Sequence, residues 1–236
     1  MLYSVKVTKG EDLTSFSSMR TPTTRAITSP LPPALQEQIH AAVAVLRNGG
    51  VVAVPTDTLY GLAADFSSAS AVRRVMEIKG RPEAMGMPLL LSDAADLSLV
   101  AIDLPKAAWT LAHRFWPGAL TLVVPRSPAV SDLVTGGRDT VAVRIPNHPV
   151  PIAIARGLGR PITGTSANRS GQPPCQTAQE VRLQLGNALD MILEGGDTPQ
   201  GIQSTIVDLT GPAPRLLRQG AVSLAAIQSI CPDLAP

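Results

Sequence analysis

One stretch of the chain, residues 49–91, restricts the fold more than any other because its hydrophobic period changes twice. Val51 to Val54 is a short β-branched run that Pro55 ends, and such a run indicates a strand covered on both faces. From Ser70, which we take as the N-cap, apolar residues recur at helical spacing, and a second apolar strand follows at 88–91. Strand, helix and strand in close succession predict one unit of an α/β fold.

Polar side chains gather at two neighbouring ends of this unit. The loop after the first strand carries Thr56, Asp57, Thr58 and Tyr60. Lys79 and Arg81 stand where the helix ends, and we expect both cations to be exposed there. Hydroxyl groups beside two cations indicate an anion site. The alternative is that the cations offset the helix dipole and that Thr-Asp-Thr forms an Asx turn. Spacing alone leaves both interpretations open.

The rest of the chain continues the alternation of strands and helices. Helices are predicted at 33–48, 105–115, 150–157, 178–185 and 222–230. Strands are predicted at 120–124, 141–145, 161–163, 190–193, 204–208 and 215–218, with a loop at 126–139. Thr177 and Glu180 form a capping box before the fourth of these helices. The pattern predicts an α/β class with an open, twisted, mixed sheet and flanking helices.

The first part of the chain differs from the rest in composition. Residues 1–31 are rich in Ser and Thr and lack the apolar centre of a signal peptide. We expect them to form a flexible N-terminal extension, with one domain over 32–236. Two alternatives stay open: translation that starts at Met19, and an organellar transit segment.

Several classes of function find no support in the residues. The formal net charge is +2 and no basic run occurs, so a dedicated nucleic-acid binder is not predicted. Two cysteines and three histidines form no metal-ligand spacing. No apolar run approaches the ~20 residues of a membrane span, which predicts a soluble, cytoplasmic protein. The chain has no P-loop, no dinucleotide-binding glycine motif and no G-x-S-x-G elbow.

Two hydrolytic arrangements were weighed against nucleotide binding. A triad of Ser166, His148 and Asp139 is available, but no spacing supports it. Asp57 and Asp65 have no evident partner for two-carboxylate hydrolysis. Polar groups instead recur at the ends of predicted strands, where open α/β sheets bind ligands. These groups are Thr56, Thr58, Lys79, Arg81, Arg144, Thr165, Ser166, Asn168, Ser204, Thr205 and Arg218.

Seven motifs resemble one family in both sequence and order. They are PTDTLYGL, KGRP with PL, WPGALTLV, VAVRIPNHP, TSANRSG, STIVDL and LLRQG. On these motifs the chain resembles the YrdC-like family, the threonylcarbamoyl-AMP synthases, from about residue 35 to about residue 220. It looks like the short form, without the extra C-terminal domain of longer relatives. The resemblance implies an open α/β fold with a cationic concave cavity.

The resemblance also implies a reaction. ATP, L-threonine and bicarbonate would give threonylcarbamoyl-AMP and pyrophosphate, with Mg²⁺ bound to ATP and no dedicated metal site on the protein. The product would serve the threonylcarbamoyladenosine modification of tRNA. A separate tRNA threonylcarbamoyl transferase machinery would carry out the transfer, and weak tRNA binding is possible.

Site residues follow from the matched motifs. Lys79 and Arg81 match the Lys-x-Arg of the family and are expected to face the phosphates as catalytic residues. ATP-binding positions are matched by Lys79, Arg81, Arg144, Thr165, Ser166, Asn168 and Arg218. Threonine-binding positions are matched by Thr56, Thr58, Tyr60 and Ser204.

Two rival functions remain at this point. One is a carbamoyl-adenylating relative, such as the related domain of hydrogenase-maturation carbamoyltransferases, whose zinc-finger cysteines this sequence lacks. The other is an RNA-binding member of the fold without adenylating activity, for which we expect strongly salt-dependent RNA binding.

Overall fold

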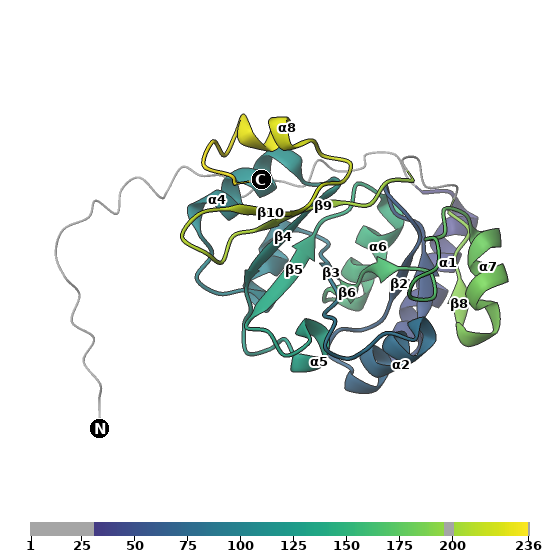
Figure 1. The fold of residues 1–236 in the computed structure, drawn as a ribbon. Helices are drawn as coiled ribbons and strands as arrows, with labels where there is room; N and C mark the ends of the chain where they lie inside the picture. Colours follow the sequence, from purple (N-terminus) through teal and green to yellow (C-terminus); the bar gives the residue numbers. More distant parts are fainter. Residues whose placement is uncertain (1–30, 196–200, 236) are drawn as a thin grey trace, which may run out of the picture.

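The structure, a computed structural model, describes residues 31–195 and 201–235. The flexible extension was expected over residues 1–31, and all of these except Leu31 lie outside the described residues. The helices of the described part are α1 (Pro33–Arg47), α2 (Ala69–Lys79), α3 (Leu97–Val100), α4 (Lys106–Phe115), α5 (Asp132–Thr135), α6 (Pro149–Leu158), α7 (Ala178–Leu185) and α8 (Leu224–Gln228). Short 3₁₀ helices occur at Ala94–Asp96 and Gly186–Ala188. Figure 1 shows these helices around a central layer of strands.

The strands are short and belong to two sheets. They are β1 (Val52–Val54), β2 (Gly61–Ala63), β3 (Leu89–Leu90), β4 (Leu120–Pro125), β5 (Thr140–Arg144), β6 (Ile162–Thr163), β7 (Thr165–Ser166), β8 (Met191–Ile192), β9 (Thr205–Asp208) and β10 (Arg215–Arg218). One sheet has the order β7-β2-β1-β8 and the other β10-β9-β4-β5-β3-β6. Each contains parallel and antiparallel pairs, such as β1 with β8 and β1 with β2. The mixed α/β class is as expected, although hydrogen bonding divides the strands between two sheets.

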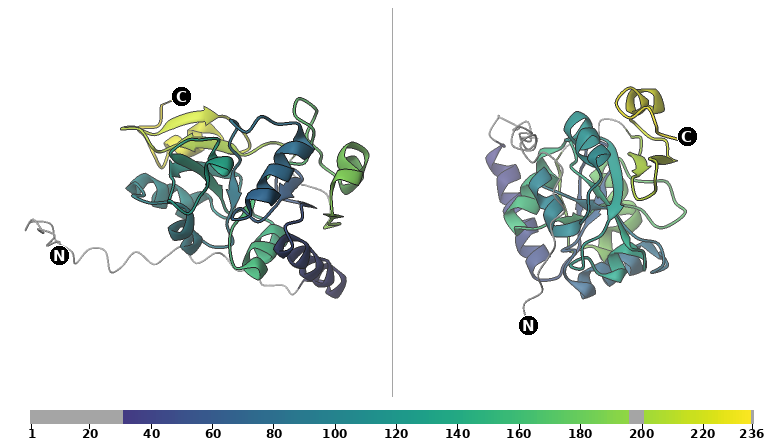
Figure 2. Two further views of the ribbon diagram at one scale, coloured as in Figure 1. Left: turned by 90° about the horizontal axis from the view of Figure 1, so that it is seen from below. Right: turned by 90° about the vertical axis from the view of Figure 1, so that its left-hand side faces the viewer.

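The first strand is buried on both faces, as its β-branched sequence predicts. Val52 and Val54 pack in the cluster that includes the apolar faces of α1 and α6. Val51 and Ala53 belong to the larger cluster, which includes the apolar face of α2. Successive side chains of a strand point to opposite faces, so β1 lies between these two helical layers. Figure 2 shows α1 and α6 next to each other on the outside of the molecule.

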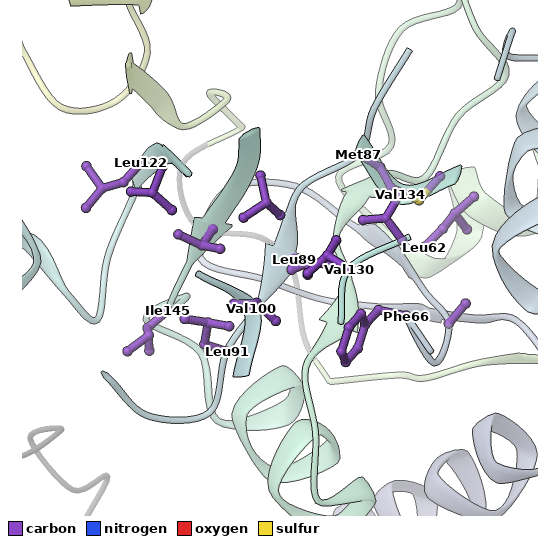
Figure 3. Close-up of a cluster of buried hydrophobic side chains, with 14 of the residues drawn as sticks. Leu62, Phe66, Met87, Leu89, Leu91, Val100, Leu122, Val130, Val134 and Ile145 are labelled. Carbon is purple, nitrogen blue, oxygen red and sulfur yellow. The ribbon is translucent and has the colours of Figure 1, made fainter. Parts of the chain in front are cut away.

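The larger hydrophobic cluster extends under the six-stranded sheet. Figure 3 shows its aliphatic centre, in which Leu89 of β3 lies among side chains from several other segments. Met87 and Val134 lie close together there, and the backbone N–H of Met87 donates to the carbonyl of Val134 at 2.8 Å. The segment before β3 is therefore fixed to α5, which positions one wall of the cavity described below.

Four local predictions differ from the structure. Helix α2 begins at Ala69 because Ser68, not Ser70, caps it by accepting from the N–H of Ala71. Residues 126–139 contain α5 rather than a plain loop. In the predicted capping box, Thr177 does accept from the N–H of Glu180, but the Glu180 carboxylate accepts from Gln176. Strands β2 and β7 were missed because two or three residues are too few to show an alternating pattern.

Candidate active site

A cavity of about 620 Å³ is lined by residues of both sheets. Its walls come from the loop after β1, the segment before β3, the end of α5, and strands β4, β5, β9 and β10. The polar lining is mainly hydroxyl and guanidinium: Thr56, Thr58, Tyr60, Arg81, Thr121, Thr135, Arg138, Thr140, Arg144, Thr165, Ser166, Ser204, Asp208, Thr210, Arg215 and Arg218. The cavity thus gathers the polar residues that the sequence predicted at strand ends, except Lys79, Asn168 and Thr205.

The loop after β1 is shaped by its own hydroxyl groups. Thr56 Oγ1 accepts from the backbone N–H groups of Thr58 and Leu59 at 3.1 and 3.2 Å, which is the local bonding expected of a Ser/Thr turn. The Tyr60 hydroxyl donates to the Leu193 carbonyl at 3.2 Å. Thr56 and Tyr60 therefore line the cavity while their hydroxyl groups hold its wall in place.

Arg144 ties this loop to the six-stranded sheet. Its guanidinium donates to Thr58 Oγ1 at 3.0 Å, to the Gly118 carbonyl at 2.7 Å and to Asp57 Oδ1 at 2.5 Å. Burial lowers the pKa of Arg144, and the charge and hydrogen bond of Asp57 act against that shift. The sequence placed Asp57 in this polar loop but did not predict its pairing, because its partner Arg144 lies on a strand far along the chain.

A second arginine of the cavity lining is held by Ser204. Arg218 donates to the Ser204 carbonyl at 2.8 Å and to Ser204 Oγ at 3.2 Å. Ser204 Oγ in turn lies 2.8 Å from Thr121 Oγ1, another residue that the sequence did not reveal. Burial, and after it the charge of Arg144, lowers the pKa of Arg218. Arg218, Ser204 and Thr121 thus form a second hydrogen-bonded set in the cavity lining, close enough to Arg144 to feel its charge.

Lys79 does not line the cavity, and the expectation that it is exposed is wrong. Only 4% of it is accessible. Its ammonium donates to the Ser166 carbonyl at 2.5 Å, to the Asn168 carbonyl at 2.9 Å and to Asn168 Oδ1 at 3.1 Å. Burial, followed by the charge of Arg81, lowers its pKa to about 8. Lys79 therefore shapes the turn after β7, and this turn presents Ser166 to the cavity.

Asn168 also stabilises the turn after β7. Its Nδ2 donates to the carbonyl groups of Arg169 and Gln172 at 2.9 and 2.7 Å, and its Oδ1 accepts from Ser166 Oγ at 2.6 Å. Lys79 and Asn168 therefore affect the shape of the cavity indirectly, because they bond the backbone carbonyl groups of this segment.

Arg81 reaches the cavity although Lys79 does not. It donates to Thr165 Oγ1 at 3.1 Å and to the Gly86 carbonyl at 2.8 Å. Burial, and then the charge of Arg138, lowers its pKa. Arg138 and Thr135 were missed because the sequence presents residues 126–139 as an ordinary loop. Their location beside two consecutive glycines was the available signal.

The structure gives no support to the triad of Ser166, His148 and Asp139, the alternative that no sequence spacing supported. The Ser166 hydroxyl donates to Asn168, and His148 Nδ1 accepts from the N–H of Val150 at the start of α6. Asp139 is exposed and lies 3.7 Å from Arg126. Each of the three groups is engaged elsewhere. Asp57, the candidate for two-carboxylate chemistry, pairs with Arg144. The site therefore offers cations and hydroxyl groups rather than an activated nucleophile.

The donor set of the cavity does not suit a metal held by the protein. Asp208 is the one carboxylate among the described lining residues, and its Oδ1 accepts from both the N–H and the hydroxyl of Thr210. Within residues 31–195 and 201–235, no three His, Cys, Asp or Glu side chains come together in a way that could hold a metal ion. None of the helices in these ranges is long and apolar enough to cross a membrane.

Comparisons with known proteins show which family the chain resembles in sequence and fold. A sequence model of the Sua5/YciO/YrdC family, described as "Telomere recombination", matches residues 44–220. The chain is similar to the threonylcarbamoyl-AMP synthase of Pyrococcus abyssi, with 40% identity over 197 residues that cover 84% of this chain and 58% of that protein. It is also similar to the threonylcarbamoyl-AMP synthase of Vibrio cholerae, with 39% identity over 79% of this chain and all of that protein.

A solved structure extends the likeness to three dimensions. The crystal structure of P. abyssi Sua5 complexed with L-threonine matches with a TM-score of 0.83 at 39% identity, over 85% of this chain and 60% of that one. The present chain therefore spans just over half of the length of the P. abyssi protein. Since the family model matches most of the chain, and since full-length relatives match nearly all of the described domain, the chain belongs to the Sua5/YciO/YrdC family.

Proposed function

We propose that this chain synthesises threonylcarbamoyl-AMP from L-threonine, bicarbonate and ATP, with release of pyrophosphate. The observation that carries the proposal is the convergence of Arg81, Arg144 and Arg218 on one cavity whose polar lining is mainly hydroxyl and guanidinium. Such a cavity suits two anionic substrates that must be brought together. The named activity of the P. abyssi and V. cholerae relatives, and the L-threonine complex of P. abyssi Sua5, support the choice of substrates.

The proposed reaction needs no covalent intermediate with the protein. The threonine amine combines with bicarbonate to give an N-carboxylate, and water leaves. One oxygen of this carbamate then forms a bond with the α-phosphorus of ATP, while the bond from that phosphorus to the bridging oxygen breaks. Pyrophosphate departs with the electron pair. The protein has to position two anions and offset their mutual repulsion, which is catalysis by orientation and electrostatic stabilisation.

Two sets of lining residues fit different parts of this reaction. Thr58 accepts a hydrogen bond from Arg144, and Ser204 accepts one from Arg218. These two pairs suit a small anion such as the threonine carboxylate or its carbamate. Arg81 and Thr165 suit phosphate oxygens. Guanidinium forks match both carboxylate and phosphate geometry.

Mg²⁺ fits as part of the ATP complex rather than as an ion held by side chains. Magnesium is usually bound through one or two carboxylates together with substrate phosphates, and Asp208 already bonds Thr210 in this cavity. We therefore assign the ion to the phosphates of ATP, whose charge it offsets, and no catalytic step of the protein residues depends on it.

The product belongs to a longer sequence of reactions in this proposal. Threonylcarbamoyl-AMP carries an activated acyl group, so a separate transferase is needed to move the threonylcarbamoyl group to adenosine in tRNA. We place both steps in the cytoplasm. Direct contact of this chain with tRNA is limited to weak binding, because the net charge is only +2 and strong binding needs several phosphate contacts.

The test is pyrophosphate release from Mg·ATP with and without L-threonine and bicarbonate. We expect release that requires both, with L-serine a much weaker substrate. Carbamoyl phosphate in place of bicarbonate and threonine tests the carbamoyl-adenylating alternative. Absence of release in every mixture, together with tight and strongly salt-dependent RNA binding, would overturn the proposal in favour of an RNA-binding protein.

A further inference from the structure

Thr205, the first residue of β9, lies outside the cavity, although its neighbour Ser204 lines it. Thr205 is fully buried, and its hydroxyl bonds the backbone of the chain that follows β10. Oγ1 donates to the Val222 carbonyl at 2.6 Å and accepts from the N–H groups of Gly220 and Val222 at 2.9 and 3.1 Å. These bonds use the one donor and both lone pairs of the hydroxyl. A single side chain thus fixes residues 220–222 against the start of β9.

Strand β10, which lies beside β9 in Figure 1, contains a bulge just before Arg218. Leu216 pairs with Val207 on β9. The next pair joins Arg218 to Ile206, so Leu217 is an extra residue on β10. Successive side chains of a regular strand point to opposite faces, yet Leu217 and Arg218 both line the cavity. The bulge therefore turns Arg218 toward the cavity, as bulges beside functional sites commonly do.

The guanidinium that the bulge turns inward is bound to Ser204. Nε and Nη2 of Arg218 donate to the Ser204 carbonyl at 3.1 and 2.8 Å, and Nη2 also donates to Ser204 Oγ at 3.2 Å. The chain after β10 packs on the same peptide group. A Cβ on Gly220 would overlap the Gln203 carbonyl oxygen and would lie 2.5 Å from the Ser204 carbonyl carbon, so this approach requires glycine. Ser204, Arg218 and Gly220 therefore form one close-packed group.

The hydroxyl of Thr205 holds this group together. The chain leaves β10 at Arg218 and is bound to β9 again at Gly220, two residues later. Without the hydroxyl, the N–H groups of Gly220 and Val222 would lose their shared acceptor. The bond from the N–H of Ala221 to the Gln203 carbonyl, at 2.9 Å, would remain. The freedom that the segment gains would lie next to the bulge, so the direction of Arg218 depends on Thr205.

We propose that Thr205 is a positioning residue for the carboxylate or carbamate of threonine. Its hydroxyl holds the chain after the bulge, and this keeps Arg218 and Ser204 directed into the cavity. Thr205 itself does not touch the substrate, since it does not line the cavity. The inference rests on the proposed function for the identity of the ligand. It also gives a role to the one threonine that the sequence placed at a strand end and that the cavity lining does not include.

The experiment measures L-threonine binding to the full chain by isothermal titration calorimetry, without ATP, in a double-mutant cycle. Thr205→Val alone should weaken the affinity roughly 10-fold, the scale of a lost hydrogen bond to a charged group. In the Arg218→Gln background the same change should weaken binding less than about twofold, because effects of residues that act through one another do not add. Thr205→Ser keeps the hydroxyl and should bind L-threonine as the wild type does.

Ser127→Ala is the matched control for the loss of a buried hydroxyl. Ser127 Oγ donates to the Leu99 carbonyl at 2.9 Å and accepts from the N–H of Ala129 at 3.2 Å, and this residue does not line the cavity. Both Ser127→Ala and Thr205→Val should lower the melting temperature, whereas only Thr205→Val should change the affinity for threonine. If Thr205→Val does not fold, Thr205→Cys, whose thiol forms weaker hydrogen bonds, replaces it in the cycle.

Each outcome decides the inference separately from the proposed function. Unchanged threonine affinity in Thr205→Val, or equal losses with and without Arg218, overturns the positioning role, even if turnover requires threonine. Coupled losses that Thr205→Ser does not show support the role, even if no threonine-dependent release of pyrophosphate is found. A wild type that does not bind L-threonine overturns both the inference and the proposed function.

Discussion

The guanidinium of Arg144 lies 2.5 Å from the carboxylate of Asp57, and both side chains are more than 90% buried. The pair joins β5 to the loop after β1, two segments that are distant in sequence. It therefore fixes the position of Thr58, which accepts a hydrogen bond from the same guanidinium. A buried ion pair of this kind is costly to break, because the remaining charge stays in a poorly solvated place.

Asp57→Asn should lower the free energy of unfolding by about 3 kcal/mol, because it leaves Arg144 buried without a counter-charge. Threonine-dependent turnover should fall as well, since the loop that carries Thr58 loses its anchor. Urea unfolding measures the first effect. Asp132→Asn is the matched control, since its pair with Arg126 has an aspartate that is 74% exposed, and it should cost less than about 1 kcal/mol. Equal losses in the two variants would contradict the assigned role of the buried pair.

Arg81→Ala should reduce pyrophosphate release by roughly 10²-fold or more, the scale for removing a donor that stabilises charge in the transition state. The melting temperature should change little. Arg169→Ala, at an exposed position just after the turn, serves as a control that keeps full activity. A large loss of stability with normal turnover would show that Arg81 is a structural residue.

The pH dependence of activity should report the protonation of Lys79. All three of its donors are used, on two carbonyl oxygens and Asn168 Oδ1, and a neutral amine has only two. Because burial lowers its pKa to about 8, activity should decline as the pH rises through about 8. Lys79→Met should have low activity at every pH and lack this decline. A decline that persists in Lys79→Met would assign the titration to another group.

The free energy of unfolding should change with pH in the opposite direction to activity: deprotonation of Lys79 should raise it. Its pKa is about 8 in the folded protein, against an ordinary value of 10.5, so between these values the unfolded chain binds more protons. The cost of the buried charge is fully present below pH 8 and is relieved as the pH rises to about 10.5, by an amount on the order of 3 kcal/mol. Urea unfolding of the wild type and of Lys79→Met at pH 7 and pH 10 measures the difference. A wild type that loses stability relative to Lys79→Met over this range would refute the sign.

Gly86→Ala should loosen the wall of the cavity beside Arg81, which donates to the Gly86 carbonyl. The added Cβ would lie 2.6 Å from the Thr135 carbonyl oxygen, so the segment before β3 must move away from α5. We expect a loss of about 1–3 kcal/mol in stability, as in overpacked cores, together with weaker pyrophosphate binding. Gly186→Ala is the control, since nothing lies within 4 Å of a Cβ there. Thermal unfolding measures the stability of both variants, and calorimetry measures their affinity for pyrophosphate.

Local features of the fold could be predicted because they depend on neighbours in sequence. The helical spacing of Val72, Val75 and Met76 gives the buried face of α2, and Pro33 near the start and Gly49 after the end bound α1. The pairings of β2 and β7 could not be predicted, because strands of two or three residues carry no periodicity of their own and exist only through their partners.

The sequence by itself determined the α/β class, most element positions and, through its motifs, which hydroxyl and cationic residues belong together. Only the tertiary structure decided which of them face the ligand space. Lys79 and Arg81 are two residues apart and look equivalent in sequence, but residues at that spacing do not share a side of a helix. Helix α2 ends at Lys79, which continues its buried face, and Gly80 with a φ of 60° then turns the chain so that Arg81 reaches the cavity. Arg138 and Thr135 entered the site for the same reason: packing of distant segments, rather than any local pattern, placed them beside Arg81.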